Sequence, residues 1–345
     1  MNPFITTGYA GPEYFCDRIE ETKALTDLLM NGNNVALMSP RRYGKTDLIR
    51  HCFGQKEISE KYCTFIIDIY STKSLAEMTE RMGKSILDTL KPKGTQAWSK
   101  FVNALSSLKG GISYDAAGVP SWTLQIGDLG NPKTTLDEIF AYLSNAEKPC
   151  LVAIDEFQQI TNYADKNVEA TLRTYIQYCP NAKFVFSGSH REMMGSMFTS
   201  SARPFYQSAT IINLPPIREE LYAEFCKKQN IRLVLVTAPL PSAYVQDTQN
   251  YQAYVDAMRS FAAANGTQYW DFSLFKDTDL LPIGFDDFSD MHHLNGQGAE
   301  TFSKAFATVA ARSAAGEDVS SLFYDTVAEK LATSPDSTVQ QGEGN

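Results

Sequence analysis

Short apolar runs alternate with amphipathic segments along the first 190 residues, and this alternation constrains the fold more than any other feature. Strands alternating with helices predict a parallel sheet flanked by helices, an α/β fold. Residues 74–108 predict one or two helices, and residues 110–130 predict either a hairpin or a loop. The predicted strands are 35–38, 63–70, 150–157 and 183–189, and the remaining predicted helices are 13–30, 46–53, 134–146 and 167–179.

A phosphate-binding pattern follows the first predicted strand. Residues 39–46 read Ser-Pro-Arg-Arg-Tyr-Gly-Lys-Thr, which is G-x-x-x-x-G-K-[ST] with a serine in place of the first glycine. In such a loop, backbone N–H groups and the helix N-terminus hold phosphate oxygens, the lysine reaches the β- and γ-phosphates, and the hydroxyl binds Mg²⁺. The pattern predicts ATP and Mg²⁺ as cofactors, with these binding residues: Ser39, Arg41, Arg42, Gly44, Lys45 and Thr46.

Polar side chains stand where two later strands are predicted to end. Asp155 and Glu156 close the run at 151–157, at the edge where open α/β sheets bind ligands. We expect Asp155 to hold Mg²⁺ with Thr46, and Glu156 to polarise the attacking water. The strand 183–189 ends in Ser189, whose hydroxyl has two interpretations: a contact to the γ-phosphate or the water, or part of an ordinary turn.

With further short motifs, these features resemble the archaeal-type ATPase family of AAA+/STAND P-loop NTPases over residues 1–228. The resemblance implies ATP and Mg²⁺ binding with slow hydrolysis, and it makes Ser39 an accepted variant. It also allows Arg191 or Arg203 to reach a phosphate, but we favour the alternative that both are solvated surface residues, which need no such role. The motifs are Phe15-Cys-Asp-Arg-Ile-Glu-Glu, residues 39–46, Ile154-Asp-Glu-Phe-Gln, Ser187-Gly-Ser, Pro204-Phe-Tyr and Leu214-Pro-Pro-Ile.

The sequence departs from that family after residue 218. Residues 218–229 look like the first helix of the family's helical lid, but the rest of the lid and a winged-helix domain do not follow. The composition changes at the same place: residues 1–230 hold 25 basic and 25 acidic side chains, whereas residues 231–345 hold 6 and 15 and thus the whole net charge of −9. All six cysteines precede residue 230. We expect a domain boundary here.

Strand and helix patterns restart beyond the boundary. Residues 231–239 and 267–273 predict strands, and residues 251–266 and 296–314 predict helices around a long acidic loop at 276–295. These features predict a partial flavodoxin-like α/β unit over 229–315. The last segment, 316–345, predicts an acidic helix at 320–332 and a disordered tail at 334–345.

The acidic loop contains Asp290 and, three residues later, His293. An Asp beside a His suits a carboxylate that orients an imidazole base. This segment resembles the last block of SGNH (GDSL-like) esterases and acyltransferases, which implies His293 as base and Asp290 as its orienting residue. No Gly-Asp-Ser nucleophile turn occurs in the chain, so the alternative is a structural loop with a capping Asp. Two unrelated family fragments then meet near residue 230, a chimeric architecture.

Composition narrows the function class. The acidic balance argues against a strongly basic nucleic-acid binder, and no apolar run is long enough to span a membrane. Scattered cysteines without a C-x-x-C pair, and an N-terminus without a secretory pattern, favour reduced thiols in a cytoplasmic protein. We expect an ATP-binding protein with slow Mg²⁺-dependent ATPase activity. The alternatives are an inactive esterase fragment and a nucleotide-binding module without turnover. An oligomer is compatible with the sequence, which identifies no client protein or nucleic acid.

Overall fold

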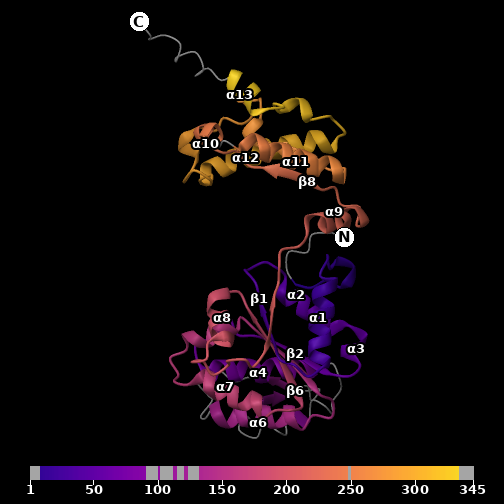
Figure 1. Cartoon of the computed structure of the whole chain (residues 1–345), viewed down its shortest axis with the longest axis vertical. Helices are drawn as coiled ribbons and strands as arrows, with labels where there is room; N and C mark the ends of the chain where they lie inside the picture. Colours follow the sequence, from indigo (N-terminus) through magenta and orange to yellow (C-terminus); the bar gives the residue numbers. More distant parts are fainter. Residues whose placement is uncertain are drawn as a thin grey trace. The chain divides into compact units, whose positions relative to one another are not determined.

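The computed structural model describes residues 8–90, 100–101, 112–114, 120–122, 132–247 and 250–333. The chain divides into two compact units, Met1–Arg218 and Glu219–Asn345 (Figure 1). The boundary lies at the N-terminal end of the predicted lid helix. Among the described residues no helix is long and apolar enough to cross a membrane.

A five-stranded parallel sheet forms the centre of the first unit. Its strand order is β2-β5-β6-β1-β7, and every neighbouring pair is parallel, as the alternating pattern predicts. Strand β1 lies between β6 and β7, so all four of its residues are buried. The strands are β1 (Val35–Met38), β2 (Cys63–Asp68), β5 (Cys150–Asp155), β6 (Ala182–Gly188) and β7 (Thr210–Asn213).

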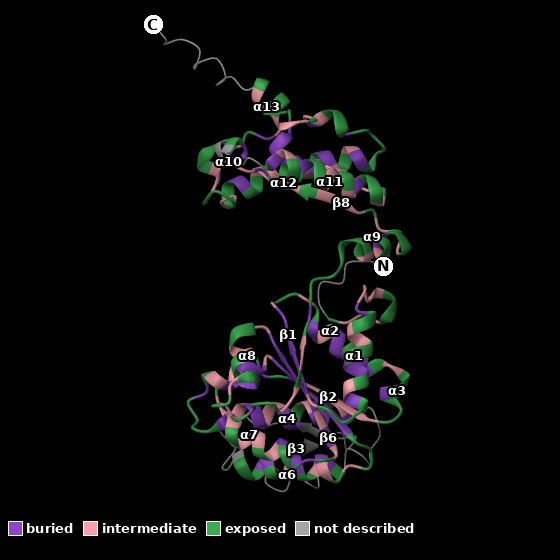
Figure 2. Cartoon of the chain, viewed as in Figure 1, coloured by how far each residue is buried: buried purple, intermediate pink, exposed green. Residues whose placement is uncertain are grey.

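Helices cover both faces of this sheet, because successive strand residues point to opposite sides. Val35 and Leu37 of β1 pack with one helix group, whereas Ala36 and Met38 pack with the other. Figure 2 shows the buried strands between the two groups. The first group is α1 (Ile19–Met30), α2 (Lys45–Gly54) and α3 (Lys56–Ser59). The second is α4 (Leu75–Leu90), α6 (Pro132–Ser144), α7 (Val168–Gln177) and α8 (Arg191–Thr199).

Several predicted boundaries of the first unit are wrong by a few residues, and the backbone explains two of them. The predicted helix 13–30 starts at Ile19, because Asp17 and Arg18 adopt left-handed φ angles of 58° and 69°; a short 3-10 helix, η1 (Pro12–Tyr14), precedes them. The predicted strand 150–157 stops at Asp155, because Glu156 has a φ of 55° and starts the 3-10 helix η4 (Phe157–Asn162).

The segment 110–130 is described only in part. Strand β3 (Ile112–Tyr114) pairs antiparallel with β4 (Pro120–Trp122), which is the hairpin alternative. Residues 91–99 and 102–108 of the predicted helical segment 74–108, and the predicted disordered tail, lie outside the described residues. Helices α3 and α8 and strand β7 were not predicted from the sequence.

The second unit has a two-stranded parallel sheet of β8 and β9, flanked by helices. Residues 319–327, predicted to lie outside the α/β segment, contribute Val319, Phe323 and Val327 to its packing. Predicted strands 231–239 and 267–273 are shorter in the structure. The elements are α9 (Glu219–Lys228), β8 (Val234–Thr237), α10 (Ser242–Asp247), α11 (Tyr251–Asn265), β9 (Gln268–Asp271), η5 (Phe272–Leu274), η6 (Phe285–Asp287), α12 (Gly296–Ala314), η7 (Ser320–Leu322) and α13 (Val327–Thr333).

Helix α9 corresponds to the predicted lid helix, but it belongs to the second unit. It buries Ala223 and Cys226 and contacts α11. The six cysteines all lie among the described residues and form no disulfide; four of them are buried.

Candidate functional site

The loop between β1 and α2 borders a cavity of about 280 Å³. Two of its residues have left-handed backbones, Arg42 with a φ of 67° and Gly44 with a φ of 81°. Glycine adopts that conformation without steric cost, which gives a local reason for Gly44 at the start of α2. The residues around the cavity are Arg41, Arg42, Gly44, Lys45, Thr46, Asp47 and Glu156.

Lys45 is the buried cation of this loop. Its side chain is 6% exposed, and its Nζ donates to the carbonyl oxygens of Ser39 at 3.0 Å and Pro40 at 3.1 Å. Burial lowers the pKa of Lys45, whereas the carboxylates of Glu156 and Asp155 oppose this change. A desolvated ammonium that is fixed on backbone carbonyls is suited to exchange those partners for a phosphate.

Thr46 and Asp155 meet across the sheet edge. The Thr46 hydroxyl donates to Oδ2 of Asp155 at 2.5 Å, although 109 residues separate them. The other carboxylate oxygen of Asp155 accepts the backbone N–H of Glu156 at 3.0 Å. A hydroxyl and a carboxylate oxygen side by side are ligands that Mg²⁺ prefers. The described residues contain no cluster of three or more His, Cys, Asp or Glu that could hold a metal by itself.

Glu156 is held by two neighbours. Its Oε2 accepts hydrogen bonds from the Ser189 hydroxyl at 2.6 Å and from Gln158 Nε2 at 2.5 Å. Ser189 follows β6 in a bend, and its hydroxyl contacts the Glu156 carboxylate; its contact to a γ-phosphate or a water stays a prediction. At Gly188, between Ser187 and Ser189, an added Cβ would lie 2.5 Å from the Met194 side chain and 2.6 Å from that of Gln158, so these side chains would have to shift.

Sequence reasoning missed three residues of this region. Gln158 is 9% exposed and holds Glu156, and Asp68 pairs in register with Asp155 across β2 and β5. The guanidinium group of Arg41 lies over the ring of Tyr70, with the guanidinium carbon 5.4 Å from the ring centre. For Asp68 a signal was available, since it ends an apolar strand as Asp155 does. Gln158 had no such signal, because its role depends on the turn at Glu156.

The motif at 15–21 reaches the same loop. Arg18 is 3% exposed; it donates to the Tyr43 carbonyl at 3.2 Å and to Glu21 at 2.9 Å. It therefore ties the start of α1 to the phosphate-binding pattern.

Arg203 donates to both carboxylate oxygens of Glu169, and Arg191 is exposed at the start of α8. Neither arginine is among the residues that border the cavity.

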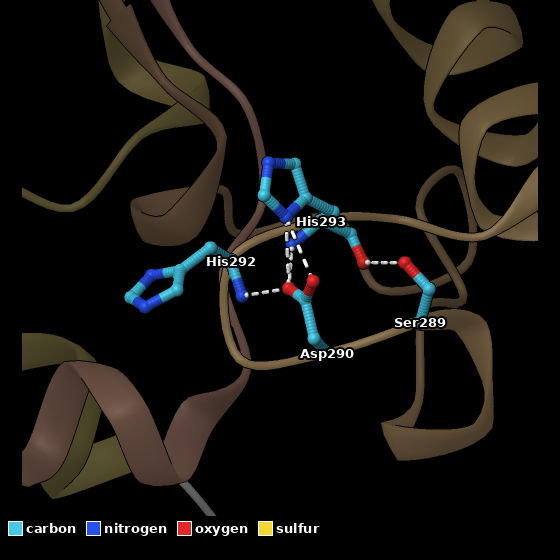
Figure 3. Close-up of polar contacts among 4 residues, drawn as sticks. All are labelled: Ser289, Asp290, His292 and His293. Carbon is cyan, nitrogen blue, oxygen red and sulfur yellow. Dashed lines mark hydrogen bonds and ion pairs between the residues drawn. The ribbon is translucent and has the colours of Figure 1, made fainter.

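The predicted dyad of the second unit forms an exposed pair. Nδ1 of His293 lies 2.9 Å from the Asp290 carboxylate, which also accepts the backbone N–H groups of His292 and His293 (Figure 3). These hydrogen bonds, that of the His292 N–H above all, lower the pKa of Asp290. The Ser289 hydroxyl donates to the backbone carbonyl of His293 at 3.1 Å (Figure 3).

Comparison with known proteins yields only distant structural similarity. No family model and no curated protein matches the chain. Among solved structures, a Walker-type ATPase of Pyrococcus abyssi shares 20% identity over 67% of this chain, with a TM-score of 0.45. The ORC2 protein of Aeropyrum pernix, solved as ADPNP–ADP complexes, shares 17% over 64%, with a TM-score of 0.43. Cdc6p of Pyrobaculum aerophilum shares 11% over 61%, with a TM-score of 0.39.

The matched regions span 63%, 53% and 48% of the length of those three proteins. At such identities and TM-scores, the likeness does not say what this chain binds. The evidence for function is therefore the geometry around Lys45, Thr46, Asp155 and Glu156.

Proposed function

We propose that the first unit binds ATP with Mg²⁺ in the cavity beside residues 39–46 and hydrolyses it slowly. The observation that carries this proposal is the 2.5 Å contact between Thr46 and Asp155 beside the buried ammonium of Lys45. It joins the predicted phosphate-binding loop and the predicted acidic strand end in one place. The choice of ATP follows from the resemblance of the motifs to archaeal-type ATPases.

The residues fit the groups that they would hold. Three cationic side chains, Arg41, Arg42 and Lys45, border the cavity and suit a polyanion. The oxygens of Thr46 and Asp155 suit Mg²⁺, which in such sites binds one or two protein oxygens, phosphate and water. Bound Mg²⁺ neutralises charge on the phosphates and thus assists their transfer to water.

Glu156 is the proposed residue that orients the attacking water. Its carboxylate borders the cavity, within reach of a group bound at the loop. Ser189 and Gln158 both donate to the same carboxylate oxygen, Oε2. Because these hydrogen bonds must weaken or rearrange before that oxygen accepts one from a water, they support slow turnover.

The test is an ATP titration of the full chain by calorimetry, in the presence of Mg²⁺. Lys45→Ala removes a charge-assisted contact worth about 1.5–3 kcal/mol, so ATP should bind at least tenfold more weakly. Lys56→Ala is the matched control: Lys56 lies in α3, is 85% exposed and forms a surface ion pair with Glu60. Equal affinities of wild type and Lys45→Ala would refute the proposal.

A second candidate function, ester hydrolysis, has one observation in its favour, the Asp290–His293 pair. The imidazole of His293 is 74% exposed. Among the described residues, the adjacent Ser289 donates to the backbone of His293 instead of to its ring. A serine hydroxyl is a weak nucleophile until a base accepts its proton. We therefore propose that the SGNH-like segment has no esterase activity of its own.

A further inference from the structure

The second unit has a cavity of its own, of about 420 Å³. Ligand pockets usually measure about 300–1,000 Å³, so the space suits a small molecule. The cavity is formed by the segment after β8, the residues around η5, the loop 281–288 and helix α13. It shares no residue with the candidate nucleotide site.

Aromatic rings form much of the wall. Phe272 and Phe275 lie with ring centres 5.2 Å apart, and Phe288 and Tyr324 border the same space. Phe285 also lines the cavity, yet 77% of its surface is exposed. Rings prefer edge or offset contacts with other rings, and a ligand ring against Phe285 would remove apolar surface from water. The wall therefore favours a flat, apolar ligand body.

Two lysines give the cavity a positive charge. Lys330 Nζ donates to the Ser273 carbonyl, and Lys276 Nζ donates to the Ser321 carbonyl at 3.1 Å while lying 5.3 Å from the Tyr324 ring centre. An ammonium has three N–H donors, so it can contact more than one acceptor. These lysines are two of only six basic residues between 231 and 345, where 15 residues are acidic.

The nearby carboxylates are already hydrogen-bonded. Asp277, which lines the cavity, accepts the N–H of Leu280 at 2.9 Å. Asp271 is 3% exposed and accepts hydrogen bonds from Tyr251, Tyr269 and the Ser273 N–H. Burial lowers the pKa of Lys330, and the charge of Asp271 opposes that change. A partly desolvated ammonium gains from a further anion close to it.

We propose that this cavity binds a small aromatic monocarboxylate, with its ring between Phe275, Phe285 and Phe288 and its carboxylate at Lys330. The ring matches the apolar wall, and the carboxylate matches the ammonium groups of Lys276 and Lys330 in the lining. This binding is separate from the nucleotide chemistry proposed for the first unit.

The probe pair is 2-naphthoate and 2-naphthamide, which share a ring system and differ in charge. Calorimetry on the full chain should show naphthoate binding at least tenfold more tightly than the amide. Lys330→Met, which keeps most of the aliphatic stem, should abolish that preference. Lys304→Met is the matched control, because Lys304 lies on α12, is 74% exposed and pairs with Glu300.

Phe285→Ala provides a test that does not depend on a buried residue. Since Phe285 is mostly exposed, its removal should leave the fold intact and weaken both probes by the same factor. Equal affinity of naphthoate and naphthamide for the wild type, or no binding of either, would overturn the proposal. So would a Phe285→Ala variant that binds both probes as tightly as the wild type.

Discussion

The hydroxyl of Ser189 donates a 2.6 Å hydrogen bond to the carboxylate of Glu156, joining the segments that follow two neighbouring strands. Glu156 has a left-handed backbone, which is uncommon for a residue with a long side chain. Such conformations often occur at functional sites, where the surrounding structure maintains them. Ser189 and Gln158 are the parts of that surrounding structure that contact the carboxylate.

Glu156→Gln should retain binding of ATP with Mg²⁺ and lose whatever hydrolysis the wild type shows. The amide has nearly the same size but cannot orient and polarise water as a carboxylate does. Phosphate release in a single-turnover assay, beside an ATP titration, separates the two effects. Hydrolysis at the wild-type rate by this variant would show that Glu156 has no such role.

Asp155→Asn should reduce the gain in ATP affinity that Mg²⁺ produces. Asp155 lies against Thr46, and the neutral amide is a weaker ligand for a hard cation than a carboxylate. We expect the ratio of ATP affinities with and without Mg²⁺ to fall by about tenfold. Asp137→Asn, on α6 outside the cavity, is the control. An unchanged ratio would contradict the assignment of Asp155 to the metal.

Trypsin should cut the native chain first after Arg218. Residues 215–220 are exposed, and Arg218 stands at the boundary between the two compact units. Its contact with Asp17 is a long surface ion pair of 3.9 Å, which gives little protection. Mass spectrometry should identify fragments 1–218 and 219–345, and Arg218→Gln should delay this cut. First cuts within the sheet of the first unit would argue against two separable units.

The second unit should not react with a fluorophosphonate probe. Such probes label serines that a base within hydrogen-bond reach activates. The hydroxyl of Ser289, beside the dyad, donates instead to the backbone carbonyl of His293. p-Nitrophenyl acetate hydrolysis should be the same for wild type and His293→Ala. Stoichiometric labelling of one serine, lost in His293→Ala, would instead establish an esterase site.

The sequence alone predicted four of the five strands of the first sheet and most of the candidate site. The runs at 35–38 and 150–154 are apolar because both faces of a central parallel strand are buried, and this leaves a clear signal in a single sequence. Asp155 and Glu156 follow the second run directly, and Lys45 and Thr46 follow the first after the loop 39–44. Their approximate meeting place was predictable, because parallel strands end at one edge of the sheet.

Only the tertiary structure identified strand β7, the unit to which α9 belongs, the contact of Gln158 and the cavity beside Lys330. Strand β7 is short and partly exposed, so only its pairing with β1 identifies it. The amphipathic pattern of helix α9 predicts a helix but not the unit to which it belongs. Its packing against α11 places it in the second unit. The contact of Gln158 with Glu156 depends on a left-handed turn, and the cavity beside Lys330 depends on four separate segments. Each is a long-range or backbone property, which residue types and spacing alone do not specify.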